Sequence, residues 1–580
     1  MNTLFAAVAS SAALSAGLLA QVTSVRMGPP DSAPTAPVQR PPTKPEDLCT
    51  LEGRVTNAIT GEPLKKAAVT IDGREFKMPW AWYTTVSDET GRYAAKGLDP
   101  GHYRVSARRS GFLGTPQRGG PPPDGTERLI TLTPGQRAAD ADLKLTPQGV
   151  VTGRVINREG EPMTGYVVTP CVFQYVGGRR VLVEATGSPE TDDAGDYRIR
   201  PLPPGRYYIL VKKQPYRGGP DSEQDRSATP RQEDYVATYY PGTADPAGAV
   251  PVEVAAGQTA SGVNITLVRA HVTRVRGRLV NQTAARVSLA LRPAGIAEMW
   301  GAQVNPGPQG EFEFSGIAPG QYVLEASALL EQNRMHRVVQ PVAVGQEPLE
   351  DLNIVFTRPY EISGTLKVEG GKDLDLRTLK VALRAPWRDA SYPNARISEM
   401  MGHATPSVSP DEKGAFRLTQ VSPQLYFVAI QNLPEGFYIK SVRMGEAEAL
   451  ENGVDLMRGA PAPLEIVLSP AAAAITGSVK SVKNDADAAA AGATVVLVPR
   501  EDARRKQPLF YRSVKTDASG NFTLTGLSPG DYKLYAWMQV ETDAWVDSEF
   551  LNPLEGKAQP VRLKEGAFEK AELRVIPAER

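Results

Sequence analysis

Residues 516–537 read TDASGNFTLTGLSPGDYKLYAW. This stretch predicts a tight turn at Gly520, a short strand beginning with Phe522, a second turn at Gly530 and a return strand opening with Tyr532. An Asp or Ser ahead of the first Gly caps nearby backbone N–H groups, while the Gly takes a positive φ. The phrase therefore describes a β-hairpin that places two aromatic rings in a small core.

The phrase recurs along the chain, which is the strongest signal in the sequence. The other copies are SDETGRYAAKGLDPGHYRV from Ser87, TDDAGDYRIRPLPPGRYYI from Thr191, NPGPQGEFEFSGIAPGQYVL from Asn305 and SPDEKGAFRLTQVSPQLYFV from Ser409. The first glycines, Gly91, Gly195, Gly310, Gly414 and Gly520, are 104, 115, 104 and 106 residues apart by subtraction. Ten residues after each comes the second turn position, occupied by Gly101, Gly205, Gly320, Gln424 and Gly530. A constant inner spacing within a variable outer one indicates one rigid unit per domain.

Copy four departs from the pattern because Gln424 stands where the others have Gly. Two explanations are open: the turn tolerates a strained residue there, or it is of another type.

Length and composition favour many small β domains. A repeat of about 100 residues suits one compact β-sandwich, and 53 Gly with 50 Pro in 580 residues favour short strands joined by turns. We therefore expect an all-β tandem array of five Ig-like or prealbumin-like antiparallel β-sandwich domains. Because 65 basic residues balance 65 acidic ones, no basic field for nucleic acid or an anionic membrane is present. Two cysteines cannot form a disulfide framework.

The predicted organisation begins with an export signal. The apolar run of residues 1–20 is too short for a comfortable membrane span and ends in a small residue, as in a signal peptide. The Pro-rich stretch that follows is typical of an extended linker. The expected segments are a signal peptide at 1–20, a Pro-rich linker at 21–45, and domains at 46–147, 148–269, 270–358, 359–469 and 470–580.

The motifs at the start and end of each unit resemble those of the carboxypeptidase regulatory-like domain family. They are the openings LEGRVTNAITGEPL and TGRVINREGEPM, the Asp-Gly and Pro-Gly hairpin, and closing strands such as LTPGQRAADADLKL. The resemblance implies a transthyretin-like (prealbumin-like) sandwich, related in shape to the B repeats of collagen adhesins (Cna-B-like) and to starch-binding-like domains. Copies three and four lack the G-x-P turn. In that family the domain is the non-catalytic appendage of a peptidase.

The residues themselves favour no catalytic chemistry. A zinc carboxypeptidase needs H-x-x-E and a distant His, but none of the four histidines has Glu three residues on, and there is no G-x-S-x-G. Asp192, Asp193 and Asp196 resemble calcium ligands but lack the loop of a calcium site, so turn capping is the better interpretation. We expect a protein that is not an enzyme and has no metal or cofactor.

The two cysteines leave a choice open. Cys171 lies in an apolar strand pattern, which favours a buried inert thiol. Export would also permit a disulfide between Cys49 and Cys171, which would join the first two domains.

One aromatic cluster is a candidate glycan platform. Trp80, Trp82 and Tyr83 occur in KMPWAWYTTV, and Trp80 and Trp82 would share one face of a strand. Exposed rings stack on sugar faces, whereas core or interdomain packing is the competing interpretation. Tyr239, Tyr240 and Trp545 are weaker candidates.

These observations predict an exported, non-catalytic β-sandwich repeat scaffold that mediates binding at the cell envelope. Its partner would be a protein or a polysaccharide, not nucleic acid, and its location secreted or periplasmic. Two alternatives remain: a carbohydrate-binding, starch-binding-like array, and a regulatory partner of a separate peptidase. The latter rests on family analogy alone.

Overall fold

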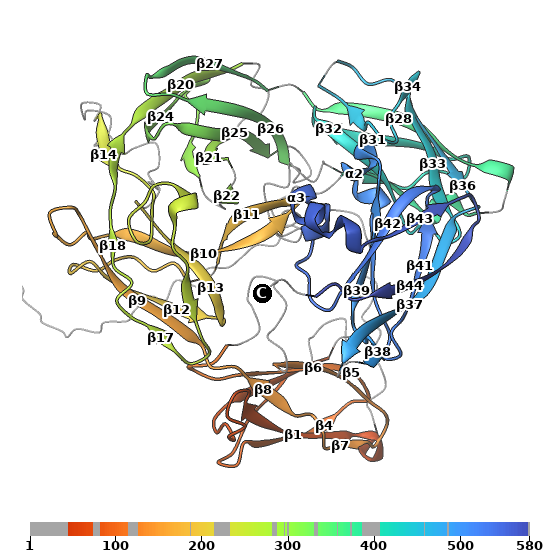
Figure 1. Cartoon of the computed structure of the whole chain (residues 1–580), viewed down its shortest axis with the longest axis horizontal. Coiled ribbons are helices and arrows are strands. Elements are labelled where there is room, and N and C mark those ends of the chain that lie inside the picture. Colours follow the sequence, from red (N-terminus) through yellow and green to blue (C-terminus); the bar gives the residue numbers. More distant parts are fainter. Residues whose placement is uncertain are drawn as a thin grey trace, which may run out of the picture.

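A computed structural model of the chain shows an all-β protein built from successive small sandwiches (Figure 1). The predicted signal peptide and all but the last two residues of the predicted linker lie outside the described residues. The residues that the structure describes are 44–73, 82–113, 126–185, 187–213, 232–280, 287–294, 296–297, 301–329, 335–356, 358–371, 374–384, 406–457, 459–483 and 486–577.

The strands fall into five consecutive groups, which we call domains one to five. Domain one pairs a β4-β1-β7 sheet, with β8 also on β1, with a β3-β2-β5-β6 sheet. It follows the short helix η1 (Pro45–Asp47), and its strands are β1 (Cys49–Asn57), β2 (Ala68–Gly73), β3 (Trp82–Val86), β4 (Arg92–Leu98), β5 (Gly101–Arg108), β6 (Glu127–Leu132), β7 (Arg137–Ala138) and β8 (Leu143–Leu145).

Domains two and three repeat this plan. Domain two contains β9 (Gly149–Ile156), β10 (Tyr166–Val176), β11 (Arg179–Glu184), β12 (Asp196–Leu202), β13 (Gly205–Lys213), β14 (Glu233–Tyr235), β15 (Thr238–Tyr239), η3 (Pro246–Gly248), β16 (Val252–Val254), β17 (Thr259–Ala260), β18 (Ile265–Thr266) and β19 (Arg269–His271). Domain three contains β20 (Thr273–Val280), β21 (Val287–Pro293), β22 (Ile296–Ala297), β23 (Ala302–Val304), β24 (Glu311–Ile317), β25 (Gly320–Leu329), β26 (Met335–Val344) and β27 (Leu349–Val355).

Domains four and five each carry an addition. Domain four has an extra hairpin, β33–β34, on its last strand, and domain five has a helical insertion between β42 and β43. Domain four contains β28 (Tyr360–Val368), η5 (Glu369–Gly371), η6 (Leu376–Thr378), β29 (Lys380–Arg384), β30 (Ser407–Val408), β31 (Ala415–Val421), β32 (Leu425–Gln431), β33 (Tyr438–Met444), β34 (Ala447–Glu448), β35 (Val454–Asp455) and β36 (Leu464–Ser469).

Domain five completes the array. It contains β37 (Ala473–Lys483), β38 (Ala486–Ala489), β39 (Thr494–Pro499), α2 (Asp502–Arg505), η8 (Pro508–Phe510), β40 (Arg512–Lys515), β41 (Asn521–Leu527), β42 (Gly530–Trp537), η9 (Ala544–Val546), α3 (Ser548–Leu551), η10 (Asn552–Lys557), β43 (Gln559–Leu563) and β44 (Phe568–Arg574). We call η9, α3 and η10 the helical cap. It packs on apolar residues of β39 and β42 that face away from the main core of the domain, including Val496, Tyr535 and Trp537.

The first strand of every domain occupies the centre of its sheet. It pairs antiparallel with the strand after the first turn and parallel with the last strand, as in β37 with β41 and β44. The other strand pairs within each sandwich are antiparallel, as the sequence predicts. The hairpin motif does not predict the parallel pairing of the first and last strands.

A glycine in each first strand makes that central position possible. A Cβ on Gly53, Gly153, Gly277, Gly364 or Gly477 would overlap a carbonyl oxygen of the last strand or of the segment just before it, and would approach the first aromatic ring of the hairpin. In domain one the hydroxyl of that ring, Tyr93, also donates to the Ala141 carbonyl at 2.5 Å. The Gly of the G-R-V opening is therefore a packing requirement.

The first turn of the hairpin forms as expected in all copies. Gly91, Gly195, Gly310, Gly414 and Gly520 have φ between 73° and 82°. In domain five the Asp517 carboxylate accepts hydrogen bonds from the backbone N–H groups of Ser519 and Asn521 at 2.9 and 2.8 Å. Asp88, Asp192 and Asp411 cap their own turns in the same way.

The second turn works differently, which resolves the question about Gln424. Gly101 and Gly530 have φ of 157° and 152°, but Gly205, Gly320 and Gln424 do not have a positive φ, so those three copies do not require a glycine here. Left-handed backbone occurs instead four residues earlier, at Gly97, Gly316, Gln420 and Gly526, with φ of 75°, 70°, 57° and 66°. The pairing of the first strand shifts register here, as at a β-bulge.

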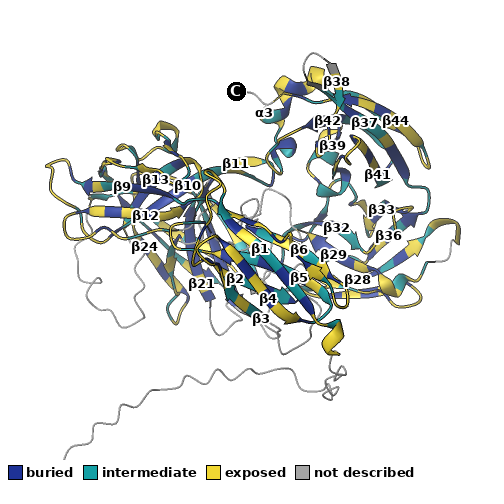
Figure 2. Ribbon diagram, turned by 90° about the horizontal axis from the view of Figure 1, so that it is seen from below, coloured by how far each residue is buried: buried dark blue, intermediate teal, exposed yellow. Residues whose placement is uncertain are grey.

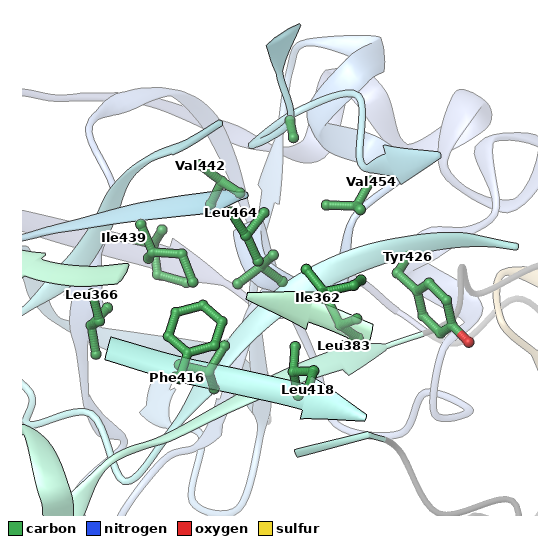
Figure 3. Packing of buried hydrophobic residues seen from close by; sticks show 14 of the residues in the cluster. Ile362, Leu366, Leu383, Phe416, Leu418, Tyr426, Ile439, Val442, Val454 and Leu464 are labelled. Carbon is green, nitrogen blue, oxygen red and sulfur yellow. The ribbon is translucent and has the colours of Figure 1, made fainter. Parts of the chain in front are cut away.

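The second aromatic of each hairpin is always Tyr because its hydroxyl is used. The hydroxyls of Tyr103, Tyr207, Tyr322 and Tyr532 donate to the backbone carbonyl four residues back at 2.7 to 2.9 Å. Their rings lie in or against the cores of their domains. Figure 3 shows the core of domain four, where Phe416 and Tyr426 pack among Ile362, Leu418 and Leu464.

The array is curled, and domains two to five contact one another in a closed ring (Figure 1). Strand β11 of domain two pairs in parallel with β22 of domain three through Leu182 and Ile296. Buried His336 of domain three shares a 2.7 Å hydrogen bond with Ser422 of domain four. Figure 2 shows β11 reaching from the domain-two side toward domain five.

Two further joints complete the ring. Leu450 and Leu509 each pack against the cores of both domain four and domain five. The ring of Tyr175, near the end of β10, contacts the ring of Phe550 in the helical cap. Domain five therefore returns to domain two.

Candidate binding site

The joint between domains four and five contains a cleft of about 390 Å³. Its apolar wall includes Phe427, Phe437 and Ile439 of domain four and Leu509 of domain five. A volume of this size at a domain interface, with mostly apolar lining and a few polar groups, is typical of a small-molecule site.

Polar contacts fix the two sides of this cleft. The Tyr438 hydroxyl donates to Glu565 at 2.5 Å, and Lys440 lies 3.0 Å from the same carboxylate. Gln507 donates to the Leu450 carbonyl, and Arg504 bonds Glu451 at 2.8 Å. Because these bonds cross from one domain to the other, the cleft has a fixed shape.

The charged groups at the cleft are Arg384, Arg512 and Glu435. The Arg512 guanidinium donates to the carbonyls of Leu509, Tyr511 and Gly526 at 2.8, 2.9 and 3.5 Å. Burial lowers the pKa of Arg512. These residues come from two repeats and neither arginine belongs to a motif, so the sequence alone does not identify them.

The structure describes only part of the predicted aromatic strand of domain one. Trp80 lies outside the described residues, and Trp82 begins β3 opposite Asp72 of β2. Tyr83 is half-buried and packs against the core cluster of domain one, and burial raises its pKa. The glycan platform therefore remains a hypothesis that rests on Trp80 and Trp82.

The weaker aromatic candidates are packed inside the protein. Tyr239 is 2% exposed, in a cluster with Cys171 and Leu210. Tyr240 packs against the core of domain two, and Trp545 is 8% exposed within the helical cap cluster. An exposed role for Tyr239 and Trp545 is wrong, because the outer sheet faces on which they lie are themselves covered.

The other predicted residues have structural partners. Asp192 caps its turn, and Asp196 pairs with Arg154 at 2.8 Å. Cys49 and Cys171 are fully buried and form no disulfide, with one in the core of domain one and the other in an outer cluster of domain two. Over the described ranges, no group of three His, Cys, Asp or Glu side chains is arranged to hold a metal ion. In the same part of the chain, no helix is both long and apolar enough to cross a bilayer.

Comparison with solved structures returns the Bacillus anthracis TIE protein and several bacterial pilins. The chain is 12% identical to the Bacillus anthracis TIE protein, over 54% of this chain and 51% of that one, with a TM-score of 0.16. It thus spans about half of that relative. It is 13% identical to GBS52, a minor pilin of Streptococcus agalactiae, over 38% of this chain and 96% of the pilin, with a TM-score of 0.22. The chain is 11% identical to BcpA, the major pilin subunit of Bacillus cereus, over 53% of this chain and 99% of the pilin subunit, with a TM-score of 0.15. Overlaps this weak carry no argument about function.

Sequence comparison is more specific for domain one. No curated protein matches the chain. Residues 50–146 match the model of the carboxypeptidase regulatory-like domain family, and this range covers β1 to β8 but for the first residue of β1. The chain is therefore a tandem β-sandwich protein that carries a carboxypeptidase regulatory-like domain at residues 50–146.

Proposed function

We propose that this protein is an exported, non-catalytic scaffold that presents a rigid set of β-sandwiches for binding at the cell envelope. The observation that carries the proposal is the closed ring of domains two to five. A chain of sandwiches joined only by linkers would move freely, because small interdomain interfaces favour relative motion. Here every consecutive pair of domains in the ring has side-chain or strand contacts, and domain five contacts domain two.

A rigid ring suits a binding platform because its surfaces keep fixed relative positions. Preorganised surfaces lose less conformational entropy when they bind a partner. We propose a protein or a polysaccharide of the envelope as that partner, with glycan recognition at Trp80 and Trp82 as the alternative mode.

The test is binding of the purified full chain to a panel of polysaccharides, cell-wall fractions and envelope proteins, alongside hydrolysis assays on peptides and glycans. The scaffold proposal predicts saturable binding to one class and no turnover. Hydrolysis that co-purifies with the protein and is lost on its depletion would overturn it.

A Trp80→Ala/Trp82→Ala double variant separates the two binding modes. Loss of polysaccharide binding, with the fold unchanged by circular dichroism, would assign glycan recognition to this strand. Binding that the variant retains would place the contact elsewhere on the protein. A matched control is Trp545→Phe, because Trp545 lies inside the helical cap.

A further inference from the structure

The cleft between domains four and five carries an unbalanced positive charge. Arg384 and Arg512 line it, and Glu435 is the carboxylate among its lining residues. Over the described part of the chain, neither arginine is within 4 Å of a carboxylate oxygen. This contrasts with Arg504 and Arg505 nearby, which pair with Glu451 and Glu555.

The partners of Arg512 are all neutral. Its three hydrogen bonds go to backbone carbonyls, two of them from the same nitrogen, Nη1. A guanidinium has five N–H donors, so donors remain for another acceptor. A partly buried cation without a counter-ion is costly, and an anion in the cleft would offset that cost.

Asn432 and Thr525 are the other polar residues of the lining, and most of the remaining lining residues are apolar. Phe427, Phe437, Ile439 and Leu509 form the wall, and Leu433 and Pro508 extend it. A small inorganic ion would leave this surface in contact with water. A ligand with an apolar body and one anionic end satisfies both parts of the cleft.

We propose that this cleft binds a small amphipathic organic anion, a carboxylate with an apolar chain or ring, whose charge is held by Arg384 and Arg512. Because the lining comes from both domains, the ligand would also bridge them and strengthen the joint. This site is independent of the platform function proposed above, and either proposal can fail without the other.

The experiment uses the full chain and the fluorescent anion 8-anilinonaphthalene-1-sulfonate, displaced by decanoate or by decanol. The two competitors share a chain length and differ in charge. We expect one saturable site for the dye. Decanoate should displace the dye at a concentration at least roughly tenfold lower than decanol does. Equal potency of the two, or no saturable site, would overturn the proposal.

Variants locate the charge. Arg384→Met and Arg512→Met should each weaken the binding of decanoate roughly tenfold and leave the binding of decanol unchanged. Arg384 is exposed and its side chain makes no hydrogen bond to another described residue, so its variant tests the charge without disturbing the fold. Arg562→Met is the matched control, because Arg562 lies on β43 with an 81% exposed side chain away from the cleft. Decanoate binding that survives both cleft variants would contradict the assignment.

Discussion

The ring of Tyr175 in domain two meets the ring of Phe550 in domain five edge to face, with centroids 5.8 Å apart. Phe550 in turn contacts Trp537, which stacks on Tyr535 at 5.3 Å. Beside this row, a Cβ on Gly178 would come within 2.6 Å of a Val546 methyl group. A continuous aromatic row therefore runs from the hairpin of domain two into the sheet of domain five, and it closes the ring.

Removing the Tyr175 ring should open this joint. An aromatic pair contributes about 0.5–1.5 kcal/mol beyond its area burial, so Tyr175→Ala should lower the closed-to-open equilibrium constant by up to roughly tenfold. Small-angle scattering of the full chain should then report a larger maximum dimension. The control is Gln174→Ala, one residue away and exposed, which should leave the scattering unchanged. Identical profiles for Tyr175→Ala and wild type would show that other contacts hold the ring.

The first-strand glycines should tolerate no side chain. In domain five, Gly477→Ala places a methyl group against the Ala571 carbonyl and the Phe522 ring. Overpacking of this kind costs about 1–3 kcal/mol, and it should lower the denaturant midpoint of domain five. Gly556→Ala is the control in the same domain, since nothing lies within 4 Å of its added Cβ. Equal midpoints for the two variants would contradict the packing role.

Two buried tyrosines of β42 should respond oppositely to loss of the hydroxyl. Tyr532 donates to the Ser528 carbonyl at 2.9 Å, so Tyr532→Phe should cost about 1–2 kcal/mol. The buried Tyr535 hydroxyl has no hydrogen-bond partner among the described residues, so Tyr535→Phe should be neutral or stabilising. Chemical denaturation of the two variants checks this pair, and the reverse order would refute the hydroxyl assignment.

The joint between domains four and five should loosen in acid. Hydrogen bonds from Tyr438 and Lys440 hold the pKa of Glu565 below its ordinary value. A carboxylate with a lowered folded-state pKa stabilises the fold above its unfolded pKa, about 4.3, and this contribution is lost as the pH falls below that value. The protection factors of amides in β33 and β44 should therefore be higher in wild type than in Glu565→Gln near neutral pH, and should fall to those of the variant as the pH is lowered. Parallel behaviour of the two proteins would contradict this role of the carboxylate.

The same joint should weaken at high pH for a separate reason. Burial, followed by the hydrogen bond to Glu565, raises the pKa of Tyr438 to about 12. A raised folded-state pKa gives stability that is present below the unfolded value, about 10, and is lost as the pH rises through 12. Tyr438→Phe should remove this alkaline dependence in the same exchange measurement. A dependence that persists in the variant would assign it to other groups.

The sequence predicts the local structure of each domain. The turn at Gly520, the alternation from Phe522 and the placement of Tyr532 follow from residue types at fixed spacing, and all are present in the structure. The bulge at Gly526 recurs at the same position in four copies. The sequence does not predict it, because a single residue within a strand pattern does not by itself indicate a bulge.

What the sequence does not show lies between domains. Tyr175 and Phe550 belong to no common motif, and neither do Arg384 and Arg512, because each pair joins segments that only the curled arrangement brings together. The exposed reading of Trp545 is wrong for a related reason: its helical insertion is folded back as a cap on its own domain. Local spacing carries no information about such docking.

The closed ring is tested most directly by the distance between domains two and five. Spin labels at Gln174→Cys and Ser548→Cys occupy exposed positions beside the Tyr175–Phe550 contact, and the native thiols are buried, with the parent protein as the labelling control. A single short, narrow distance distribution is the result that the closed ring predicts. A long and broad distribution would contradict it and describe sandwiches that move independently.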